Sequence, residues 1–281
     1  MHLRHILAAM DRSEAGRDAA RTAIDLATRC SARLTILHVA SHRRAPLHAE
    51  ITRAADESDA AVASLRRWLE TEVVAPGELE RIQLEAAVGV PAIEICRLAE
   101  SDRADLVVLG RKHSADMPRL LLGDTADAVA RRSPVPTLFV PRPIREPGRV
   151  LVALDGSPRV MVVLQEASDF ARSMGADLEV VTVEGAPGQG ERDEPAMPAE
   201  RSRAVQSRAG ELLSAEGFPG KQVAIRRGDV VESVIAHCLE MQADVLVIGY
   251  HRGAAPSILG AGSTAQRLGH AAPCAVLTVP L

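Results

Sequence analysis

Gly262-Ser263-Thr264 is a run whose residue types and position could bind an anion. The three residues open a helical pattern, after a glycine-bearing loop that follows a strand-like run ending at Gly249. The first turn of a helix offers N–H groups without intrahelical partners and about half a positive charge, and glycine lets the backbone approach a phosphate closely. The sequence therefore predicts a phosphate-binding element of strand, loop and helix over 243–265. An ordinary capped helix start would use the same residues, and that interpretation stays open.

The same element occurs earlier in the chain, over 104–126, with glycines again at Gly110 and Gly123. The following residue is Asp124, where the later copy has a serine. A carboxylate at this point stabilises the helix by about 0.3 to 1 kcal/mol, and it competes with a phosphate for the same N–H groups. Thr125 is a weak substitute for the serine. The chain is therefore a duplication whose two copies differ at the predicted anion site.

Two polar residues follow the first expected strand of each half. They are Asp155 and Ser157 in the second half and Asp11 and Ser13 in the first, at an offset of 144 residues. In a parallel sheet, ligands bind beyond the carboxyl ends of the strands where the strand order reverses. Asp155 and Ser157 are therefore expected beside the loop that follows Gly249. Both serines are also typical helix N-caps, and both aspartates could simply hydrogen-bond their own loops.

Strands alternate with helices through both halves, which predicts an α/β fold with parallel sheets, right-handed crossovers and helices on both faces. The segment 142–148 contains two prolines and is the expected linker, which gives two domains over 1–143 and 148–281. The polar segment 185–198 is expected to be a mobile loop. In the first half the expected strands are 6–10, 34–39, 81–86, 106–109 and 137–140, with helices over 14–30, 49–74 and 124–132.

The composition is that of a globular protein able to bury a core, with 47% hydrophobic and 25% charged residues among 281. A net charge of -4 and only 2% aromatic residues argue against a nucleic-acid partner. No apolar run approaches the roughly 18 residues of a membrane span, so the expected location is the cytoplasm. The four cysteines form no C-x-x-C pair and are expected to be buried, reduced thiols, and no metal site is expected.

These motifs resemble the universal stress protein family in its tandem two-domain form. The resemblance covers essentially the whole chain and rests on Asp-x-Ser after each first strand, the glycine before each third helix, the strand ending at Gly249 and the closing P-C-A-V-L-T-V-P. It implies two doubly wound, Rossmann-like domains, each a five-stranded parallel sheet of order 3-2-1-4-5. It further implies an intramolecular pseudo-dimer through the fifth strands, and it leaves a homodimer of chains open.

Members of that family that bind ATP carry Gly, two residues, Gly, nine residues, Gly and then Ser or Thr after the fourth strand. The second half departs from this pattern at Arg252, although Gly253 follows and could take the turn if the loop shifts by one residue. The resemblance implies binding of ATP, with or without Mg²⁺. It places Asp155 and Val183 at the adenine and ribose end and Gly249, His251, Gly253, Gly262, Ser263 and Thr264 around the phosphates. Ser157 is a further candidate binding residue.

The first half departs further from the pattern, because His113 replaces the second glycine and Asp124 replaces the Ser or Thr. These changes are expected to weaken binding by about 1 to 3 kcal/mol, or roughly 5- to 150-fold. We therefore predict that the first half is degenerate and holds no nucleotide. Its weaker candidate residues are Asp11, Val39, Gly110, Gly123 and Thr125.

Two functions remain open on this evidence. The first is a stress-response regulatory protein that binds ATP or a related adenine nucleotide mainly in its C-terminal domain. The second is a tandem stress protein without nucleotide that acts as a protein-interaction module. The sequence has no G-x-x-x-x-G-K-[ST] motif, and no Ser-His-Asp or paired-carboxylate set stands out. Efficient catalysis is not indicated, and at most slow ATP hydrolysis is expected.

Overall fold

The computed structural model describes residues 2–40, 51–74, 78–111, 124–144, 148–184, 198–251 and 264–281. These residues form two compact units. The first comprises the described residues from Leu3 to 144, and the second comprises those from Gly148 to Leu281. The expected loop over 185–198 lies outside the described residues except for Pro198.

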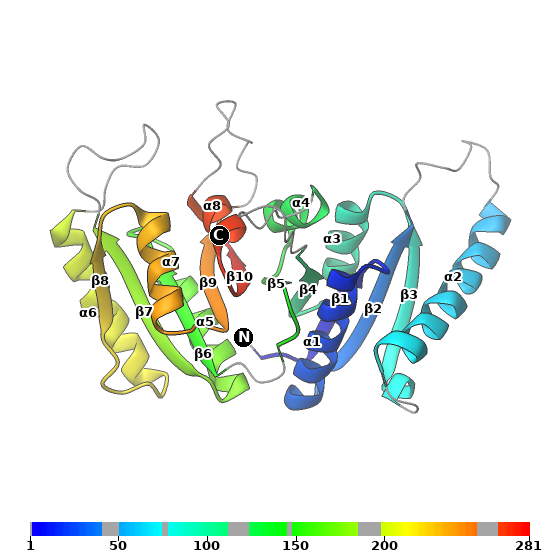
Figure 1. Ribbon diagram of the computed structural model, residues 1–281, viewed down its shortest axis with the longest axis horizontal. Coiled ribbons are helices and arrows are strands. Elements are labelled where there is room, and N and C mark those ends of the chain that lie inside the picture. Colours follow the sequence, from blue (N-terminus) through cyan, green and yellow to red (C-terminus); the bar gives the residue numbers. More distant parts are fainter. Residues whose placement is uncertain are drawn as a thin grey trace. The chain divides into compact units, whose positions relative to one another are not determined.

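The first unit is an α/β domain whose strands all pair in parallel in the order β3-β2-β1-β4-β5. Figure 1 shows the alternation of strands and helices along the chain. A short 3-10 turn, Glu78–Arg81, leads into β3. The elements are β1 (His5–Met10), α1 (Glu14–Cys30), β2 (Arg33–Ala40), α2 (Ile51–Glu72), β3 (Ile82–Val88), α3 (Pro91–Ser101), β4 (Leu106–Gly110), α4 (Asp124–Arg132) and β5 (Thr137–Val140).

The second unit repeats this plan, with parallel strands in the order β8-β7-β6-β9-β10. Counted within the unit, this is again the order 3-2-1-4-5, so the predicted fold class and strand order are confirmed. The elements are β6 (Arg149–Leu154), α5 (Val160–Met174), β7 (Asp177–Glu184), α6 (Ala199–Ala215), β8 (Val223–Arg227), α7 (Val230–Glu240), β9 (Val245–Tyr250), α8 (Thr264–Ala271) and β10 (Ala275–Pro280).

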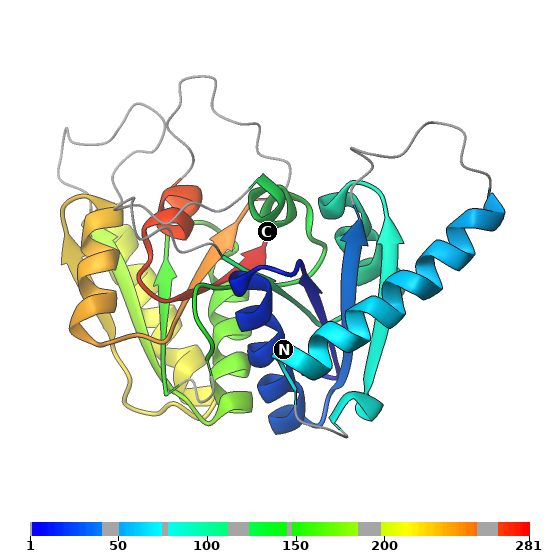
Figure 2. The ribbon, with the colours of Figure 1, turned by 45° about the vertical axis from the view of Figure 1, so that its right-hand side comes forward.

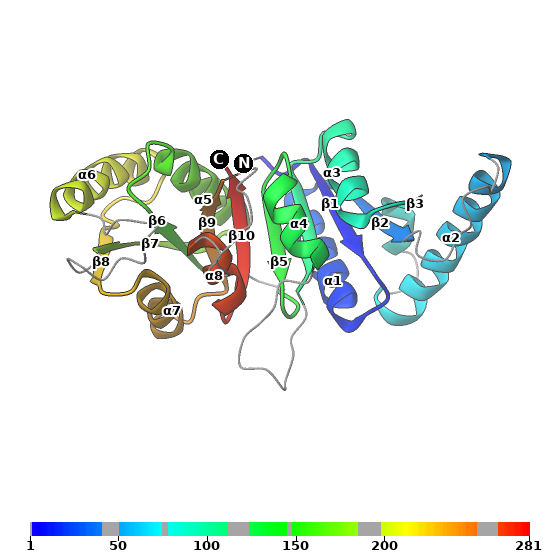
Figure 3. The same cartoon turned by 90° about the horizontal axis from the view of Figure 1, so that it is seen from above.

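Helices cover both faces of each sheet, as buried parallel strands require. In the first unit α1 and α2 lie on one face and α3 and α4 on the other (Figure 3), and Figure 2 shows α2 crossing in front of β2 and β3. An ion pair of 3.2 Å between Arg17 and Glu72 joins α1 to α2. In the second unit Arg172 on α5 pairs with Glu216 at the end of α6, while buried residues of α7 and α8, among them Val234 and Leu268, share one core cluster.

An aspartate anchors the start of the first strand in each unit. Asp244 Oδ2 accepts hydrogen bonds from the backbone N–H groups of Gly148 at 2.8 Å and Arg149 at 3.0 Å. Asp105 does the same for residues 4 and 5, at 2.8 and 2.9 Å. Both units therefore share one arrangement, in which the residue before the fourth strand hydrogen-bonds the backbone at the start of the first strand.

Replacement of Asp244 by alanine is expected to lower the free energy of unfolding by about 1 to 3 kcal/mol, because two backbone donors lose a charged acceptor. The matched control is Asp177→Ala, which removes only an exposed ion pair to Lys221 and is expected to cost about 0 to 1 kcal/mol. Urea unfolding followed by circular dichroism measures both. Equal losses in the two variants would show that the hydrogen bonds of Asp244 contribute no more to the free energy of unfolding than an exposed ion pair does.

Burial lowers the pKa of His5, and this effect outweighs the hydrogen bond with the Asp102 backbone, which raises the pKa; the nearby Arg33 guanidinium lowers it further, and the charges of Asp102 and Asp105 raise it slightly. His5 as a residue is 4% exposed, and its Nε2 lies 2.9 Å from Thr35 Oγ1. The folded protein therefore holds a neutral imidazole that the unfolded chain would protonate below its ordinary pKa of 6.5. The unfolded state then binds more protons, so stability falls as the pH falls.

The expected result is a loss of about 1 kcal/mol in the free energy of unfolding between pH 7 and pH 5.5 that is due to His5. The measurement is urea unfolding at both pH values for the wild type and for His5→Gln. The glutamine variant should be less stable at pH 7 and should lose less on acidification. If the two proteins lose the same amount, His5 does not titrate as a buried neutral group.

Several local predictions can be compared directly with the structure. Ser13 is the N-cap of α1, as expected, and its side chain accepts from the Gly16 N–H. Ser157 is not the N-cap of α5, because a turn closed by Val160 N to Ser157 O at 3.2 Å precedes the helix and Arg159 takes the cap position. The four cysteines are free thiols. The prediction that they are buried is confirmed for Cys238 and Cys274 and is wrong for Cys30 and Cys96, which are half-buried.

Candidate nucleotide site and a second pocket

The predicted crevice lies at the carboxyl ends of β6 and β9, which are neighbours in the sheet. Asp155 follows β6, is exposed, and accepts a hydrogen bond from the Ser157 N–H at 2.9 Å. The Ser157 hydroxyl is buried and has no hydrogen-bond partner among the described residues. A buried hydroxyl without a partner costs free energy. This loop therefore keeps an unused donor and acceptor at the switch point of the sheet.

The corresponding loop of the first unit satisfies its own polar groups. The Ser13 hydroxyl donates to Asp11 Oδ1 and accepts from the Gly16 N–H at 3.2 Å. Asp11 Oδ1 also accepts from the Ser13 N–H at 3.1 Å. The serine of this loop is thus committed to the aspartate and to the first turn of α1, so the two loops differ in the polar groups they leave for a ligand.

The glycines that end the fourth strands are required by close packing. A Cβ atom at Gly110 would lie 2.2 Å from the Ala15 carbonyl oxygen in the first turn of α1. At Gly249 a Cβ atom would lie 2.7 Å from Leu281 Cδ1 and 3.0 Å from Val163 Cγ2. The contact in the first unit is with backbone, and that in the second is with side-chain ends. Contact of these glycines with a ligand stays a prediction.

The other predicted residues of the second unit surround the same end of the sheet. His251 follows β9 directly and is exposed, and Thr264 is the half-buried first residue of α8. Val183 is 6% exposed and belongs to the core cluster that contains Ile248 and Val231. The positions Gly253, Gly262 and Ser263 lie outside the described residues.

In the first unit the weaker candidates take comparable positions. Val39 is half-buried near the end of β2, and Thr125 is half-buried as the second residue of α4. Asp124 is exposed and opens α4, as the sequence predicted. Gly123 lies outside the described residues. A carboxylate thus lies in the first turn of α4, where the helix dipole favours it.

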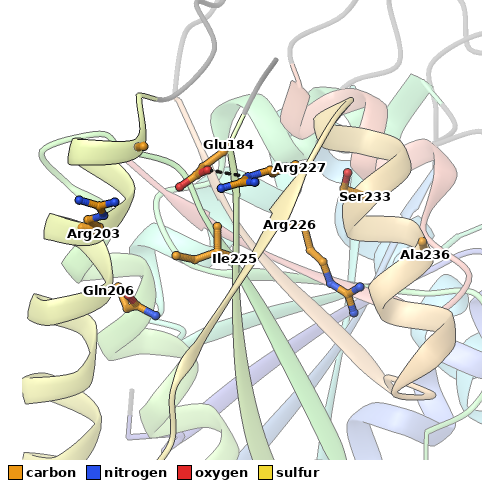
Figure 4. Close-up of a pocket in the computed structure, with 9 residues that line it drawn as sticks. Glu184, Arg203, Gln206, Ile225, Arg226, Arg227, Ser233 and Ala236 are labelled. Carbon is orange, nitrogen blue, oxygen red and sulfur yellow. Dashed lines mark hydrogen bonds and ion pairs between the residues drawn. The ribbon is translucent and has the colours of Figure 1, made fainter. Parts of the chain in front are cut away.

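A pocket of about 700 Å³ lies elsewhere in the second unit, around β8 and between α6 and α7 (Figure 4). Sequence reasoning missed it, and none of the predicted site residues lines it. Three arginines approach it, with one carboxylate at the end of β7. Its lining residues are Glu184, Ala199, Arg203, Gln206, Ile225, Arg226, Arg227, Ser233 and Ala236.

The charges near this pocket are partly paired. Arg227 Nε lies 3.1 Å from Glu184 Oε2, yet the arginine side chain is 83% exposed. On the opposite face of the strand, Arg226 hydrogen-bonds His237 Nδ1 at 2.6 Å and pairs with Glu240. The pocket is thus basic, with one of its three guanidinium groups held by α7.

Within the described part of the chain, no group of three or more His, Cys, Asp or Glu residues is arranged to hold a metal ion. Among the helices of the same residues, none is long and apolar enough to cross a membrane.

In comparisons with known proteins, both halves of the chain match the same family. The model of the universal stress protein family matches residues 2–141 and again 147–280. A universal stress protein of Methanocaldococcus jannaschii is 39% identical over 66 residues, which are 24% of this chain and 39% of that protein's length.

Solved structures resemble the chain over its whole length. A universal stress protein from Archaeoglobus fulgidus superposes with a TM-score of 0.75 at 19% identity, covering 100% of this chain and 99% of its own. A protein of unknown function from Pseudomonas aeruginosa gives a TM-score of 0.62 at 18% identity over 99% and 92%. At these identities the likeness shows the fold alone. Because the family model matches both halves, the chain belongs to the universal stress protein family and carries two tandem domains of it.

Proposed function

We propose that this protein is a stress-response regulator that binds ATP or a related adenine nucleotide mainly in its C-terminal domain. The observation that carries the proposal is the difference between the two loops after the first strands. The Ser157 hydroxyl is buried without a partner among the described residues, whereas the Ser13 hydroxyl is engaged by Asp11 and Gly16. A ligand with hydroxyl and phosphate oxygens would hydrogen-bond the Ser157 hydroxyl. In the first unit it would find the Ser13 hydroxyl already hydrogen-bonded.

The position of α8 supports the same assignment. Its first residue, Thr264, follows the predicted Gly262-Ser263 pair, and the N-terminus of a helix attracts phosphate through its N–H groups and its dipole. In the first unit Asp124 occupies the corresponding first turn of α4 and would repel a phosphate. Mg²⁺, where it is present, would enter with the triphosphate, since hard cations bind phosphate oxygens.

Regulation would follow from filling and emptying this site. A nucleotide that bridges the Asp155 loop and the start of α8 would order both, and it would change the surface they offer to partner proteins of the stress response. We expect any hydrolysis to be slow, because the described residues at this end of the sheet supply no general base paired with a nucleophile. The cytoplasm as location, the pseudo-dimer of the two halves and a homodimer of chains stay predictions.

The proposal is tested by titrating the wild type, Ser157→Ala and Ser13→Ala with a fluorescent ATP analogue, and by competing the analogue with unlabelled ATP and GTP. Ser157→Ala is expected to weaken binding about 5- to 30-fold, which corresponds to the loss of one or two buried hydrogen bonds. Ser13→Ala should leave the affinity within about twofold and lower stability by about 1 kcal/mol through the lost cap of α1. A stronger effect of Ser13→Ala on affinity would place the nucleotide in the first unit.

The second candidate is an interaction module without nucleotide. It is favoured by the first unit, where Asp124 and the self-satisfied Ser13 leave little for a phosphate. Failure of the wild type to bind any adenine nucleotide in the titration would favour this candidate over the first.

A further inference from the structure

The pocket around β8 lies at the edge of the second unit's sheet, and within the described residues β8 pairs with β7 alone. Gly228 N donates to Glu184 O on β7 at 3.2 Å, while Gln206 Nε2 on α6 donates to Val223 O from the other side at 3.2 Å. Backbone groups alternate in direction along a strand. The N–H and C=O groups of Ile225 and Arg227 therefore point away from β7, toward the open edge.

Positively charged side chains lie beside this edge, on the face of β8 that is next to α6. Arg203 projects from α6, is exposed, and makes no ion pair within the described part of the chain. Arg227 is 83% exposed on the same side of β8, and Figure 4 shows Ile225 directed to that side as well. Among the described residues of the lining, Glu184 is the single carboxylate, and it faces Arg227. Within the described residues, the edge of β8 therefore offers unpaired backbone groups, and the adjoining face next to α6 adds an apolar side chain and a net positive charge.

The first unit supplies an internal comparison. At the offset of 139 residues, Ala87 and Val88 stand where the second unit has Arg226 and Arg227. The sheet registers agree with this alignment, since Val39 pairs with Ala87 as Val183 pairs with Arg226. The fold thus accommodates small uncharged residues at this edge, so the arginines are not required for the sheet.

We propose that the edge of β8 is a docking site for an extended acidic segment of a partner protein, which adds as a further strand beside β8. Its backbone would bond the outward N–H and C=O groups of Ile225 and Arg227, and its carboxylates would meet Arg203 and Arg227. Main-chain hydrogen bonds give such strand addition its affinity, and charge complementarity gives it selectivity and speed. A small anion would use the guanidinium groups and leave the strand groups unsatisfied, which is why we favour a peptide.

The first test uses a fluorescein-labelled synthetic peptide of alternating valine and glutamate, seven residues long, with the full-length protein. Fluorescence anisotropy compares it with a glutamine version and with a version N-methylated at alternate backbone nitrogens. The acidic peptide is expected to bind, the glutamine version about tenfold more weakly, and the N-methylated version not measurably. Equal binding of the N-methylated peptide, or no binding of the acidic one, would overturn the proposal.

The second test changes the protein. The double variant Arg203→Gln, Arg227→Gln is expected to bind the acidic peptide about tenfold more weakly. Arg208→Gln is the matched control, because Arg208 is exposed on the same helix and outside the pocket, and it should change binding less than about twofold. Circular dichroism verifies that all variants fold. If Arg208→Gln weakens peptide binding as much as the double variant does, the effect comes from the overall charge of the protein, and the assignment is overturned.

Other occupants of the edge give different results. If inorganic phosphate displaces the peptide completely while the N-methylated peptide binds as well as the original, the pocket is a simple anion site. If light scattering finds a dimer of the wild type that the double variant loses, the edge pairs with a second copy of this chain. Either result would overturn the proposal, and neither depends on the nucleotide site.

Discussion

Gly110→Ala is expected to lower the free energy of unfolding by about 3 kcal/mol, at the upper end of what overpacking costs. A Cβ atom there would lie 2.2 Å from the carbonyl oxygen and 2.4 Å from the carbonyl carbon of Ala15. Both are backbone atoms of the first turn of α1, so relief requires a shift of the helix against β4. The interiors of proteins are too densely packed to absorb such a shift without loss.

The matched control is Gly210→Ala on α6, where no described atom apart from the local backbone of that helix lies within 4 Å of the added Cβ. It is expected to stabilise the protein by about 0.5 to 1 kcal/mol, because alanine favours a helix over glycine. Urea unfolding of both variants measures the contrast. An unfolding midpoint of Gly110→Ala equal to that of the wild type would show that α1 does not pack on β4 this closely.

Gly262→Asp is expected to reduce the affinity of the C-terminal domain for ATP by about 100-fold or more. The change puts a carboxylate two residues before α8, where it repels the phosphates and competes for the N–H groups of the helix start. Glycine has no side chain, so the change removes no side-chain contact and the fold should be spared. A titration with Mg-ATP gives the affinity.

The control for this variant is Ser207→Asp, which adds the same charge at an exposed position of α6. It should leave the affinity unchanged within about twofold, because an exposed charge on another helix is screened in 0.1 M salt. Wild-type affinity in Gly262→Asp would show that the nucleotide does not lie against the start of α8.

Most of the fold could be predicted from the sequence because residues that begin and end helices and strands are clearly placed. The helix over 124–132 and the strand over 137–140 begin and end where they were expected, since an acidic first turn opens one and prolines flank the other. The third strand was placed at 81–86 and runs instead from Ile82 to Val88. Its flank forms a 3-10 turn, and Ala86-Ala87-Val88 has no polar alternation to mark a strand.

The candidate sites were harder to predict, because they depend on atoms that come together only in the fold. Ser157 has a residue type typical of an N-cap, and only the turn before α5 shows that its hydroxyl is left without that role. The pair Arg226-Arg227 ends β8, but its meaning depends on that strand lying at the sheet edge beside α6. The implied strand order already placed the third strand of each half at an edge, so this clue could have been used.

The central claim is that one half of the tandem holds a nucleotide and the other does not. It is tested most directly by counting the adenine nucleotide bound per chain at saturating Mg-ATP, in equilibrium dialysis of the full-length protein. We expect about one nucleotide per chain, and about none in Gly262→Asp. About two per chain would contradict the degenerate first half, and none in the wild type would contradict nucleotide binding altogether.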